Sequence, residues 1–424
     1  MQEVIVVKGG RKLYGEISVD TAKNAVLPII AGCILSKKEI VLKNLPNISD
    51  VNKMLEILEI MGAKVKKDDK LKTASITVED LSTVEIPAGL AKEIRSSIFM
   101  LGALISRFKK ARVTYPGGCD IGSRPIDLHL SGLRDLGVEI SEDYGYINCD
   151  ARNMHAGVVH LDFPSVGATE NIMMSAVLLD GQTTILNSAK EPEIVDLANF
   201  INSLGGKIKG AGTSTIVIDG VKELSGGEYN PISDRIITGT YLIACCMTGG
   251  EIKLLNANYQ DVYALLNKLR NAGAKIDYGK DFITLSMKKR PLACTSIETQ
   301  PYPGFPTDLQ AQILALQTIS DGISIITENL FETRFKQVPE LLKMGAKITI
   351  KDRMAIVRGT NTLYGAEVEA GDLRGGASLV LAGLVAKGET MVFNPYFIDR
   401  GYEGLEEKLK ILNAEIYRVK RDWF

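Results

Sequence analysis

The sequence predicts an α/β fold made of two similar domains, and three observations lead to this prediction. A helix end followed by a strand start recurs six times along the chain. A second landmark, the end of a short strand, recurs with nearly the same spacing. The chain of 424 residues, 45% of them hydrophobic, is also long enough for two cores, since single cores stop growing at roughly 250–300 residues.

The helix-to-strand motif is the most regular of these features. It places Gly or Asn at positions 62, 137, 205, 273, 345 and 413, spaced 68 to 75 residues apart. Both residues tolerate the positive φ that terminates a helix, and an amphipathic helical pattern precedes each motif, as in residues 193–204. A repeat period of roughly 70 residues predicts six strand-rich units with two helices each. Three units per domain put the midpoint near Asn230-Pro231.

The second landmark precedes each of these helices. Short predicted strands end at Asn44, Pro116, Asn187, Asn256, Asn329 and Asn394. The positions 21 residues earlier are Lys23, Arg95, Val166, Arg235, Asp308 and Leu373. Each lies at or just before the start of an apolar helical stretch, so the sequence predicts a second helix that begins there in every unit.

Charged residues gather at these predicted helix starts. Helix capping readily explains the aspartates, which are Asp234, Asp308 and Asp372. Capping does not explain cations, because the N-terminal end of a helix dipole is positive. A bound polyanion, which helix N-terminal N–H groups attract, accounts better for the four cations there, which are Lys23, Arg95, Arg235 and Arg374. An anion site assembled from both halves is expected in the cleft between the domains.

Composition limits the classes of function. The net charge of −1 gives no reason to expect nucleic acid or a membrane surface as partner. The N-terminus lacks the pattern of a signal peptide. The longest apolar stretch, residues 25–35, contains Pro28 and is far shorter than the roughly 20 residues that span a bilayer. We therefore expect a soluble, cytosolic protein.

The six cysteines and three histidines show no metal-ligand spacing, so neither a metal site nor disulfides are expected. Five of these cysteines fall in core-like positions, which are Cys33, Cys149, Cys245, Cys246 and Cys294. Cys119 differs, because it lies in the polar, glycine-rich segment 115–125 with Arg124 nearby. That environment favours thiolate character. A loop cysteine without a catalytic role is the alternative.

Several separate motifs together identify a family resemblance. They are Lys23-Asn24, Pro116-Gly-Gly-Cys-Asp-Ile-Gly-Ser-Arg-Pro-Ile-Asp-Leu-His129, Ser165-Val-Gly-Ala-Thr169, Asp234-Arg235, Phe305-Pro-Thr-Asp308, Phe331-Glu-Thr-Arg334, Asp372-Leu-Arg374 and Ile398-Asp-Arg-Gly-Tyr402. In this order and over the whole length, the chain resembles the UDP-N-acetylglucosamine 1-carboxyvinyltransferases. The resemblance implies two inverted, inside-out α/β barrel domains of three βαβαββ-type units each. It puts the first domain at residues 22–231 and the second at 1–21 plus 232–424.

The resemblance also implies a reaction. The family transfers the enolpyruvyl group of phosphoenolpyruvate to the 3′-hydroxyl of UDP-N-acetylglucosamine and releases phosphate, the first committed step of peptidoglycan precursor synthesis. Residues implied to bind the phosphate of phosphoenolpyruvate are Lys23, Arg124 and Arg400. Arg334 and Arg374 are implied to bind its carboxylate, with Asn24 close by. Guanidinium forks suit both anions, because they pair bidentately with them.

The UDP-sugar is implied to contact both halves of the chain. The implied residues are Arg95, Arg124, Pro125, Ile126, Asp127, Leu128, Phe163, Pro164, Ser165, Val166, Asp308 and Leu330. Phe163 departs from the basic residue that some relatives carry, but the backbone N–H groups of residues 165–167 could still bind the diphosphate.

Four residues are implied to be catalytic: Cys119, Asp308, Lys23 and Arg400. Asp308 is the expected base for the sugar hydroxyl, and Cys119 the proton donor to C3. Cys119 can also form a covalent adduct with the enolpyruvyl carbon, so its acid and nucleophile roles stay open. No metal or other cofactor is implied.

Two other functions compete with this interpretation. The shikimate-pathway enolpyruvyl transferase shares fold and donor but lacks the cysteine loop. A non-catalytic relative that senses the UDP-sugar would not need the complete set of reactive residues that this sequence keeps.

Overall fold

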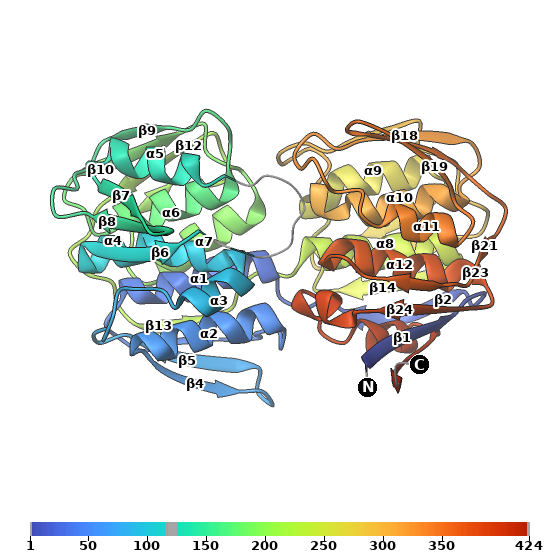
Figure 1. The fold of residues 1–424 in the computed structure, drawn as a ribbon, viewed down its shortest axis with the longest axis horizontal. Helices are drawn as coiled ribbons and strands as arrows, with labels where there is room; N and C mark the ends of the chain where they lie inside the picture. Colours follow the sequence, from blue (N-terminus) through green and yellow to red (C-terminus); the bar gives the residue numbers. More distant parts are fainter. Residues whose placement is uncertain (1, 116, 118–124, 422–424) are drawn as a thin grey trace. The chain divides into compact units, whose positions relative to one another are not determined.

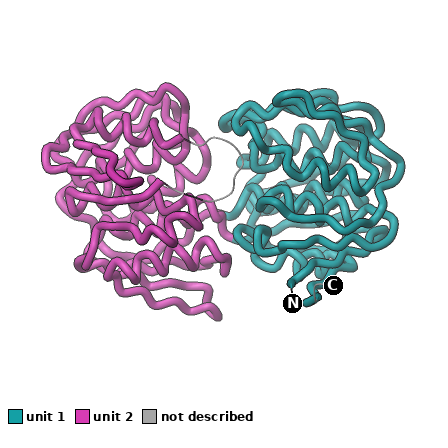
Figure 2. The backbone as a smooth tube through the Cα atoms, in the orientation of Figure 1, with its two compact units in different colours: residues 1–20, 120–123, 233–424 teal, residues 21–119, 124–232 magenta. Residues whose placement is uncertain are grey.

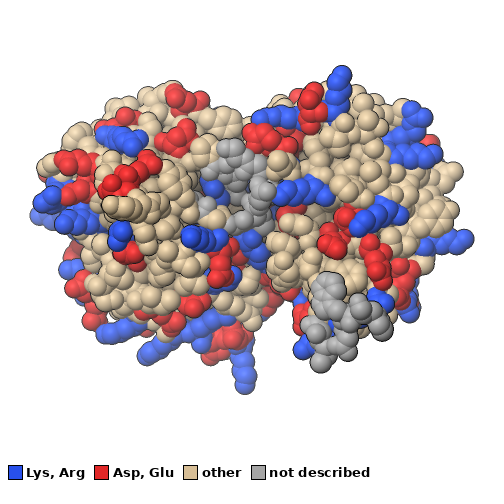
Figure 3. Space-filling view, viewed as in Figure 1, with Lys and Arg blue, Asp and Glu red and all other residues tan. Residues whose placement is uncertain are grey.

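The computed structural model describes residues 2–115, 117 and 125–421 (Figure 1). These residues form two compact units (Figure 2). Unit 1 contains the described residues of 1–20 and 233–424, and unit 2 contains those of 21–119 and 124–232. Each unit has its own cluster of buried hydrophobic residues. On the face drawn in Figure 3, basic and acidic residues are interspersed.

Unit 2 contains three sheets. Their strand orders are β13-β3-β5-β4, β6-β8-β7 and β11-β12-β10-β9. The strands are β3 (Ile40–Leu42), β4 (Lys64–Asp68), β5 (Thr73–Thr77), β6 (Lys110–Thr114), β7 (Glu139–Asp143), β8 (Tyr146–Asp150), β9 (Val158–His160), β10 (Gln182–Leu186), β11 (Ile208–Lys209), β12 (Thr215–Asp219) and β13 (Gly227–Tyr229).

Unit 1 also contains three larger sheets, and the short pair β21-β23. The orders are β15-β16-β14-β2, β17-β18-β20-β19 and β22-β24-β1-β25. The strands are β1 (Gln2–Lys8), β2 (Leu13–Ser18), β14 (Gly250–Leu255), β15 (Lys275–Tyr278), β16 (Phe282–Met287), β17 (Ser296–Glu298), β18 (Ile323–Thr327), β19 (Lys347–Lys351), β20 (Met354–Arg358), β21 (Leu363–Tyr364), β22 (Glu367–Glu369), β23 (Ala386–Lys387), β24 (Glu389–Phe393) and β25 (Glu415–Arg421).

The six larger sheets share one pairing scheme. In each, a strand that follows a buried helix pairs in parallel with one neighbour and antiparallel with another, as β18 does with β17 and β20. A third antiparallel strand completes the sheet, as β19 does. In the β6 sheet, a parallel bridge between Glu85 and Arg112 replaces the first neighbour. In the β24 sheet, the N-terminal strand β1 is the antiparallel partner of β24, and it pairs on its other side with β25. The described strands therefore confirm six repeats of common topology, three in each unit.

In each of the six sequence repeats, one helix begins where the second landmark predicts. These helices are α1 (Lys23–Gly32), η2 (Arg95–Phe99) continued by α4 (Met100–Phe108), α6 (Val166–Ala176), α8 (Arg235–Thr248), η4 (Thr307–Leu309) continued by α10 (Gln310–Ile319), and α12 (Leu373–Val385). They are buried over most of their length, and α8, α10 and α12 contact one another within unit 1 (Figure 1). The prediction of six helix starts is confirmed.

The second helix of each of the six repeats ends just before the predicted terminator residue. These helices are α2 (Ser49–Met61), α5 (Asp127–Asp135), α7 (Pro192–Ser203), α9 (Tyr263–Asn271), α11 (Val338–Lys343) and α13 (Leu405–Ile411). The residue at each predicted terminator position has positive φ, from 77° at Asn413 to 110° at Gly62. The remaining short helices are α3 (Ala88–Glu93), η1 (Cys33–Leu35), η3 (Tyr259–Val262) and η5 (Pro395–Arg400). No helix within the described ranges is long and apolar enough to cross a membrane.

The terminator role can be tested at Gly205. Its φ is 101°, and no atom lies within 4 Å of a Cβ added there, so Gly205→Ala changes only backbone strain. We expect a loss of about 1–2 kcal/mol in the free energy of unfolding, because L-residues disfavour the left-handed region. Gly89→Ala is the matched control, since the added Cβ also meets open space but φ is not positive. It should stabilise by about 0.4–1 kcal/mol. Urea unfolding of both variants measures the difference, and equal effects would contradict the strain argument.

Candidate active site

Asp308 lies at the centre of a charged cluster in unit 1. One carboxylate oxygen accepts a hydrogen bond from Nη2 of Arg334 at 2.7 Å, and the other accepts from Nη2 of Arg374 at 3.0 Å. Both arginine side chains are buried, at 4% and 3% exposure, whereas Asp308 keeps 26%. Burial alone would raise the pKa of Asp308, but Arg374 and Arg334 hold it well below its usual value. The carboxylate is therefore ionised at neutral pH and can accept a proton.

The two guanidinium groups have binding capacity beyond Asp308. Nε and Nη1 of Arg334 and of Arg374 are buried and find no hydrogen-bond partner among the described residues. Buried donors in proteins are normally satisfied. Two guanidinium groups share one carboxylate here. The cluster is suited to a carboxylate or phosphate of a ligand, which would supply the missing acceptors.

The capping alternative holds for two of the three aspartates and is wrong for Asp308. Asp234 accepts from the backbone N–H groups of Ile236 and Ile237, at 2.7 and 2.9 Å. Asp372 caps α12 in the same way. The N-cap residues of η4 and α10 are Pro306 and Leu309, and neither helix has a side-chain cap. Asp308 points its carboxylate at the two guanidinium groups instead.

The remaining predicted residues of unit 1 are Arg400 and Leu330. Arg374 is the second residue of α12, which contacts η5, and Arg400 is the last residue of η5. The Arg374 guanidinium also lies 5.4 Å from the centre of the Tyr402 ring. Leu330 follows β18, and its N–H donates to the buried Glu328. Glu328 is not among the residues that the sequence singled out.

In unit 2, Lys23 opens α1 and forms an ion pair with Asp50 of α2. The Nζ–Oδ2 distance is 2.7 Å, and both side chains are largely buried. Asn24 follows directly, and Arg95 opens η2, which packs against α1. Sequence reasoning missed Asp50, because an acidic residue in the first turn of a helix is common for capping and dipole reasons alone.

The two segments predicted to bind the UDP-sugar lie on neighbouring helices of unit 2. Residues 125–128 lead into α5, and residues 163–166 lead into α6, which contacts α5. Ser165 caps α6 through the N–H of Ala168. His129 Nδ1 lies 2.8 Å from Asn171 Nδ2, which joins the two helices. Phe163 is 46% exposed, so its ring is available to a ligand.

Cys119 and Arg124 lie outside the described residues. Each cysteine that is described is buried. Burial raises the pKa of Cys149 and of Cys245 to about 12, and it also raises that of the other three thiols. These thiols are therefore poor nucleophiles. Over the described ranges no group of three or more His, Cys, Asp or Glu residues could hold a metal ion.

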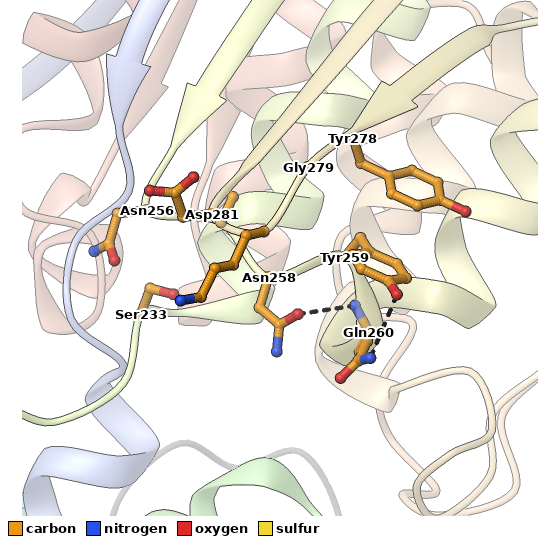
Figure 4. A pocket seen from close by; sticks show the side chains of 10 residues that line it. Ser233, Asn256, Asn258, Tyr259, Gln260, Tyr278, Gly279 and Asp281 are labelled. Atoms are coloured by element: carbon orange, nitrogen blue, oxygen red, sulfur yellow. Dashed lines mark hydrogen bonds between the residues drawn. The ribbon is translucent and has the colours of Figure 1, made fainter.

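One cavity of unit 1 lies elsewhere. It has a volume of about 720 Å³ and is lined by residues that follow β14 and the turn between β15 and β16, among them Asn258, Tyr259, Tyr278 and Lys280 (Figure 4). The Tyr259 and Tyr278 rings stack with their centres 4.2 Å apart. None of the predicted site residues lines this cavity.

Glu170 of α6 is a buried carboxyl group that the predicted chemistry does not use. Neither of its oxygens has a hydrogen-bond partner among the described residues. Burial raises its pKa well above the usual value, and the nearby Glu193 and Glu191 raise it further. The folded protein therefore keeps Glu170 protonated at a pH where the unfolded chain has ionised it.

This shift predicts a pH-dependent gain in stability for Glu170→Gln. A raised carboxyl pKa makes wild-type stability fall as pH rises from the unfolded pKa of about 4.3 towards the folded one. Gln has no charge to bury, so its advantage should grow by up to about 1.4 kcal/mol per pH unit over that interval. Thermal unfolding at pH 5 and pH 8 measures this. Glu59→Gln on the exposed face of α2 is the control and should show no such trend. A Glu170→Gln advantage independent of pH would contradict the buried protonated state.

Comparisons with known proteins agree with one another. Residues 7–409 match the family model described as EPSP synthase (3-phosphoshikimate 1-carboxyvinyltransferase). A protein of Caldanaerobacter subterraneus subsp. tengcongensis named UDP-N-acetylglucosamine 1-carboxyvinyltransferase 2 is 51% identical over 97% of this chain and 99% of its own length. A protein of the same name from Clostridium tetani is 47% identical, over 98% of this chain and 99% of its own.

Solved structures support the fold alone. The enolpyruvyl transferase NikO from Streptomyces tendae superposes with a TM-score of 0.88 at 23% identity, covering 99% of this chain and 100% of its own. An EPSP synthase from Acinetobacter baumannii gives a TM-score of 0.76 at 14% identity over the same shares of both chains.

Proposed function

Because this chain belongs to the UDP-N-acetylglucosamine 1-carboxyvinyltransferases of the EPSP synthase family, we propose that it transfers the enolpyruvyl group of phosphoenolpyruvate to the 3′-hydroxyl of UDP-N-acetylglucosamine. Phosphate is released, and the product enters peptidoglycan synthesis. The single observation that carries the chemistry is Asp308 held between two buried guanidinium groups whose Nε and Nη1 atoms find no hydrogen-bond partner among the described residues.

The donor substrate requires a site for two anionic groups. We assign its carboxylate to Arg334 and Arg374, whose buried Nε and Nη1 donors find no hydrogen-bond partner among the described residues and can donate to carboxylate oxygens. We assign its phosphate to Lys23, Arg124 and Arg400, with Asn24 beside them. Lys23 is held by Asp50, which orients its ammonium. Positive charge at the developing ketal stabilises the transition state electrostatically.

The acceptor is assigned to both units. In unit 2 we assign it to Arg95, Arg124, the run Pro125, Ile126, Asp127 and Leu128, and the run Phe163, Pro164, Ser165 and Val166. In unit 1 we assign it to Asp308 and Leu330. The α6 N-terminus, with its backbone N–H groups, suits the diphosphate. We propose that residues 22–231 form one enolpyruvyl-transferase domain, that residues 1–21 and 232–424 form the other, and that each is an inside-out α/β barrel.

The reaction needs one proton removed and one supplied. We propose that Asp308 takes the proton of the 3′-hydroxyl as it attacks C2 of phosphoenolpyruvate. Cys119 gives a proton to C3, and Lys23 and Arg400 stabilise the phosphate as it leaves. In the elimination step C3 loses a proton and the bond from C2 to the phosphate oxygen breaks, which forms the enol ether of the product and frees phosphate. Both substrates are small and water-soluble, so we place the reaction in the cytoplasm, without a nucleic-acid or membrane partner.

Phosphate release tests this function directly. Purified protein should release phosphate only when phosphoenolpyruvate and UDP-N-acetylglucosamine are both present. Shikimate 3-phosphate in place of the UDP-sugar should give no release. Phosphate release from phosphoenolpyruvate with shikimate 3-phosphate but not with the UDP-sugar would support the shikimate-pathway alternative. Binding of the UDP-sugar without turnover would support the non-catalytic alternative.

The role of Cys119 predicts selective alkylation. Fosfomycin, an epoxide that mimics phosphoenolpyruvate in this family, should modify Cys119 and spare the five buried cysteines, whose thiol pKa values are raised. Peptide mass mapping after treatment locates the adduct. Denatured protein treated with iodoacetamide is the control that all six thiols can react. A fosfomycin adduct mainly on Cys33 or Cys245 would show that the assignment is wrong.

A further inference from the structure

Glu328 is fully buried directly after β18, and its carboxylate accepts four hydrogen bonds. Oε1 accepts from Thr299 Oγ1 at 2.8 Å and from the N–H groups of Leu330 and Phe331 at 2.9 and 3.1 Å. Oε2 accepts from Thr307 Oγ1 at 2.8 Å. Hydrogen bonds to an ionised acceptor are stronger than neutral ones. One side chain thereby links β17, the loop after β18 and the turn that carries Asp308.

These contacts connect Glu328 to the charged cluster of Asp308, Arg334 and Arg374. Thr307 is the residue before Asp308 in η4. The Phe331 ring lies 5.5 Å from the guanidinium carbon of Arg334. Arg334 in turn donates to Asp308 at 2.7 Å. Glu328 is therefore connected to Asp308 by two sets of contacts. One runs through Thr307, and the other through Phe331 and Arg334.

We propose that Glu328 is a positioning residue that fixes the orientation of the Asp308 carboxylate against the sugar hydroxyl. The inference rests on the proposed role of Asp308 as base and adds a residue that acts through it. Glu328 touches neither substrate in this scheme. Its two oxygens hold the two segments, 307–308 and 330–331, that contribute Asp308 and Leu330 to the site. Misplacing a reacting group by about 1 Å can cost roughly 100-fold in rate.

The two threonines that donate hydrogen bonds to Glu328 allow the proposal to be tested with a pair of variants. Thr307 and Thr299 each donate a hydrogen bond of 2.8 Å to Glu328, Thr307 to Oε2 and Thr299 to Oε1. Thr→Val removes the hydroxyl and keeps the shape in both cases. Only Thr307 is adjacent to Asp308, so Thr307→Val should lower kcat by roughly 10- to 100-fold, with little change in KM for UDP-N-acetylglucosamine. Thr299→Val should lower the unfolding midpoint, because the Thr299 hydroxyl also accepts from the N–H of Asn329 at 2.9 Å. It should leave kcat within about threefold, because Leu330 and Phe331 still hold Oε1.

The conservative variant Thr307→Ser keeps the hydroxyl and should restore kcat. Burial raises the Asp308 pKa, and Arg374 and Arg334 lower it. Thr307→Val removes none of these influences, so the acidic limb of the kcat/KM pH profile should not move. Equal losses of kcat in Thr307→Val and Thr299→Val, or no rescue by Ser, would overturn the inference and leave Glu328 a purely structural residue.

A measurement independent of turnover separates this inference from the proposed function. Hydrogen exchange followed by mass spectrometry should show faster exchange in residues 305–310 of Thr307→Val than of Thr299→Val. If the wild-type protein released no phosphate from the two substrates, the proposed function would fail, and the exchange result would still decide whether Glu328 holds the Asp308 turn. Identical exchange in the two variants would overturn the inference.

Discussion

Asp308→Asn is expected to lower kcat by roughly 10²–10⁴-fold. The affinity for UDP-N-acetylglucosamine should change much less, because many assigned contacts lie elsewhere. The wild-type carboxylate is ionised at neutral pH, since Arg374 and Arg334 hold its pKa well below the usual value. An amide cannot accept the hydroxyl proton as C2 is attacked. Steady-state assays, with sugar affinity measured by calorimetry, separate the two effects.

The same substitution has a structural cost that must be measured beside the rate. Asp308 accepts from both guanidinium groups, whereas Asn has one acceptor oxygen and presents its NH₂ to the other arginine. Removing one partner from a buried ion pair commonly costs about 3–5 kcal/mol. Asp308 is partly exposed, so we expect a smaller loss here, which thermal unfolding with and without UDP-sugar measures.

Asp234→Asn is the matched control for Asp308→Asn. Asp234 occupies the equivalent helix start in another repeat, is buried, and accepts from two backbone N–H groups. Asn caps helices about as well as Asp, so this variant should keep near-normal kcat. Near-normal kcat in Asp308→Asn as well would show that Asp308 is not the base. A loss in Asp308→Asn alone, in folded and sugar-binding protein, supports the catalytic role.

The repeat made the local structure predictable from the sequence. A recurring backbone conformation demands the same residue type each time, so positive φ selects Gly or Asn at every terminator. Asn44, Asn187, Asn256 and Asn394 also have positive φ, and each follows a short strand. Counting back from these landmarks located the helix starts at Lys23 and Arg235 because the intervening segment has a nearly constant length.

The contacts within the site were not predictable in the same way. Arg334 and Arg374 lie 26 and 66 residues from Asp308, and no local rule connects them to it. Asp50 and Glu328 read as ordinary acidic residues near the ends of a helix and a strand. Their partners depend on the direction of side chains in the packed unit, which sequence spacing along one helix does not specify.

Arg374→Lys is expected to raise KM for phosphoenolpyruvate by roughly 10- to 100-fold. Arg374 donates from Nη2 to Asp308 and leaves Nε and Nη1 without partners among the described residues. Lys keeps the charge but has a single ammonium on a flexible stem, so it cannot hold Asp308 and also present further N–H donors in the fixed directions of a guanidinium. A lost hydrogen bond to a charged group costs about 1.5–3 kcal/mol, and 1.4 kcal/mol corresponds to a factor of about ten.

The pH profile of Arg374→Lys should change in a defined direction. Arg374 and Arg334 favour the charged form of Asp308 and lower its pKa. A weaker partner than Arg374 stabilises that form less, so the pKa of Asp308 should rise from its low value. The base would then become protonated at a higher pH than in the wild-type protein. The acidic limb of the kcat/KM profile should therefore move to higher pH, while activity near neutral pH still reflects an ionised carboxylate.

Arg418→Lys is the matched control for Arg374→Lys. Arg418 lies in the same unit and is held by three carboxylates, with distances of 3.1 Å to Glu3, 2.7 Å to Asp399 and 2.5 Å to Glu406. No substrate contact is assigned to it, so Arg418→Lys should change stability without changing KM for phosphoenolpyruvate. A similar KM in Arg374→Lys and wild type would contradict the carboxylate assignment. An equal rise in KM for both substrates would indicate general damage to the site, because only the smaller anion is assigned to this guanidinium.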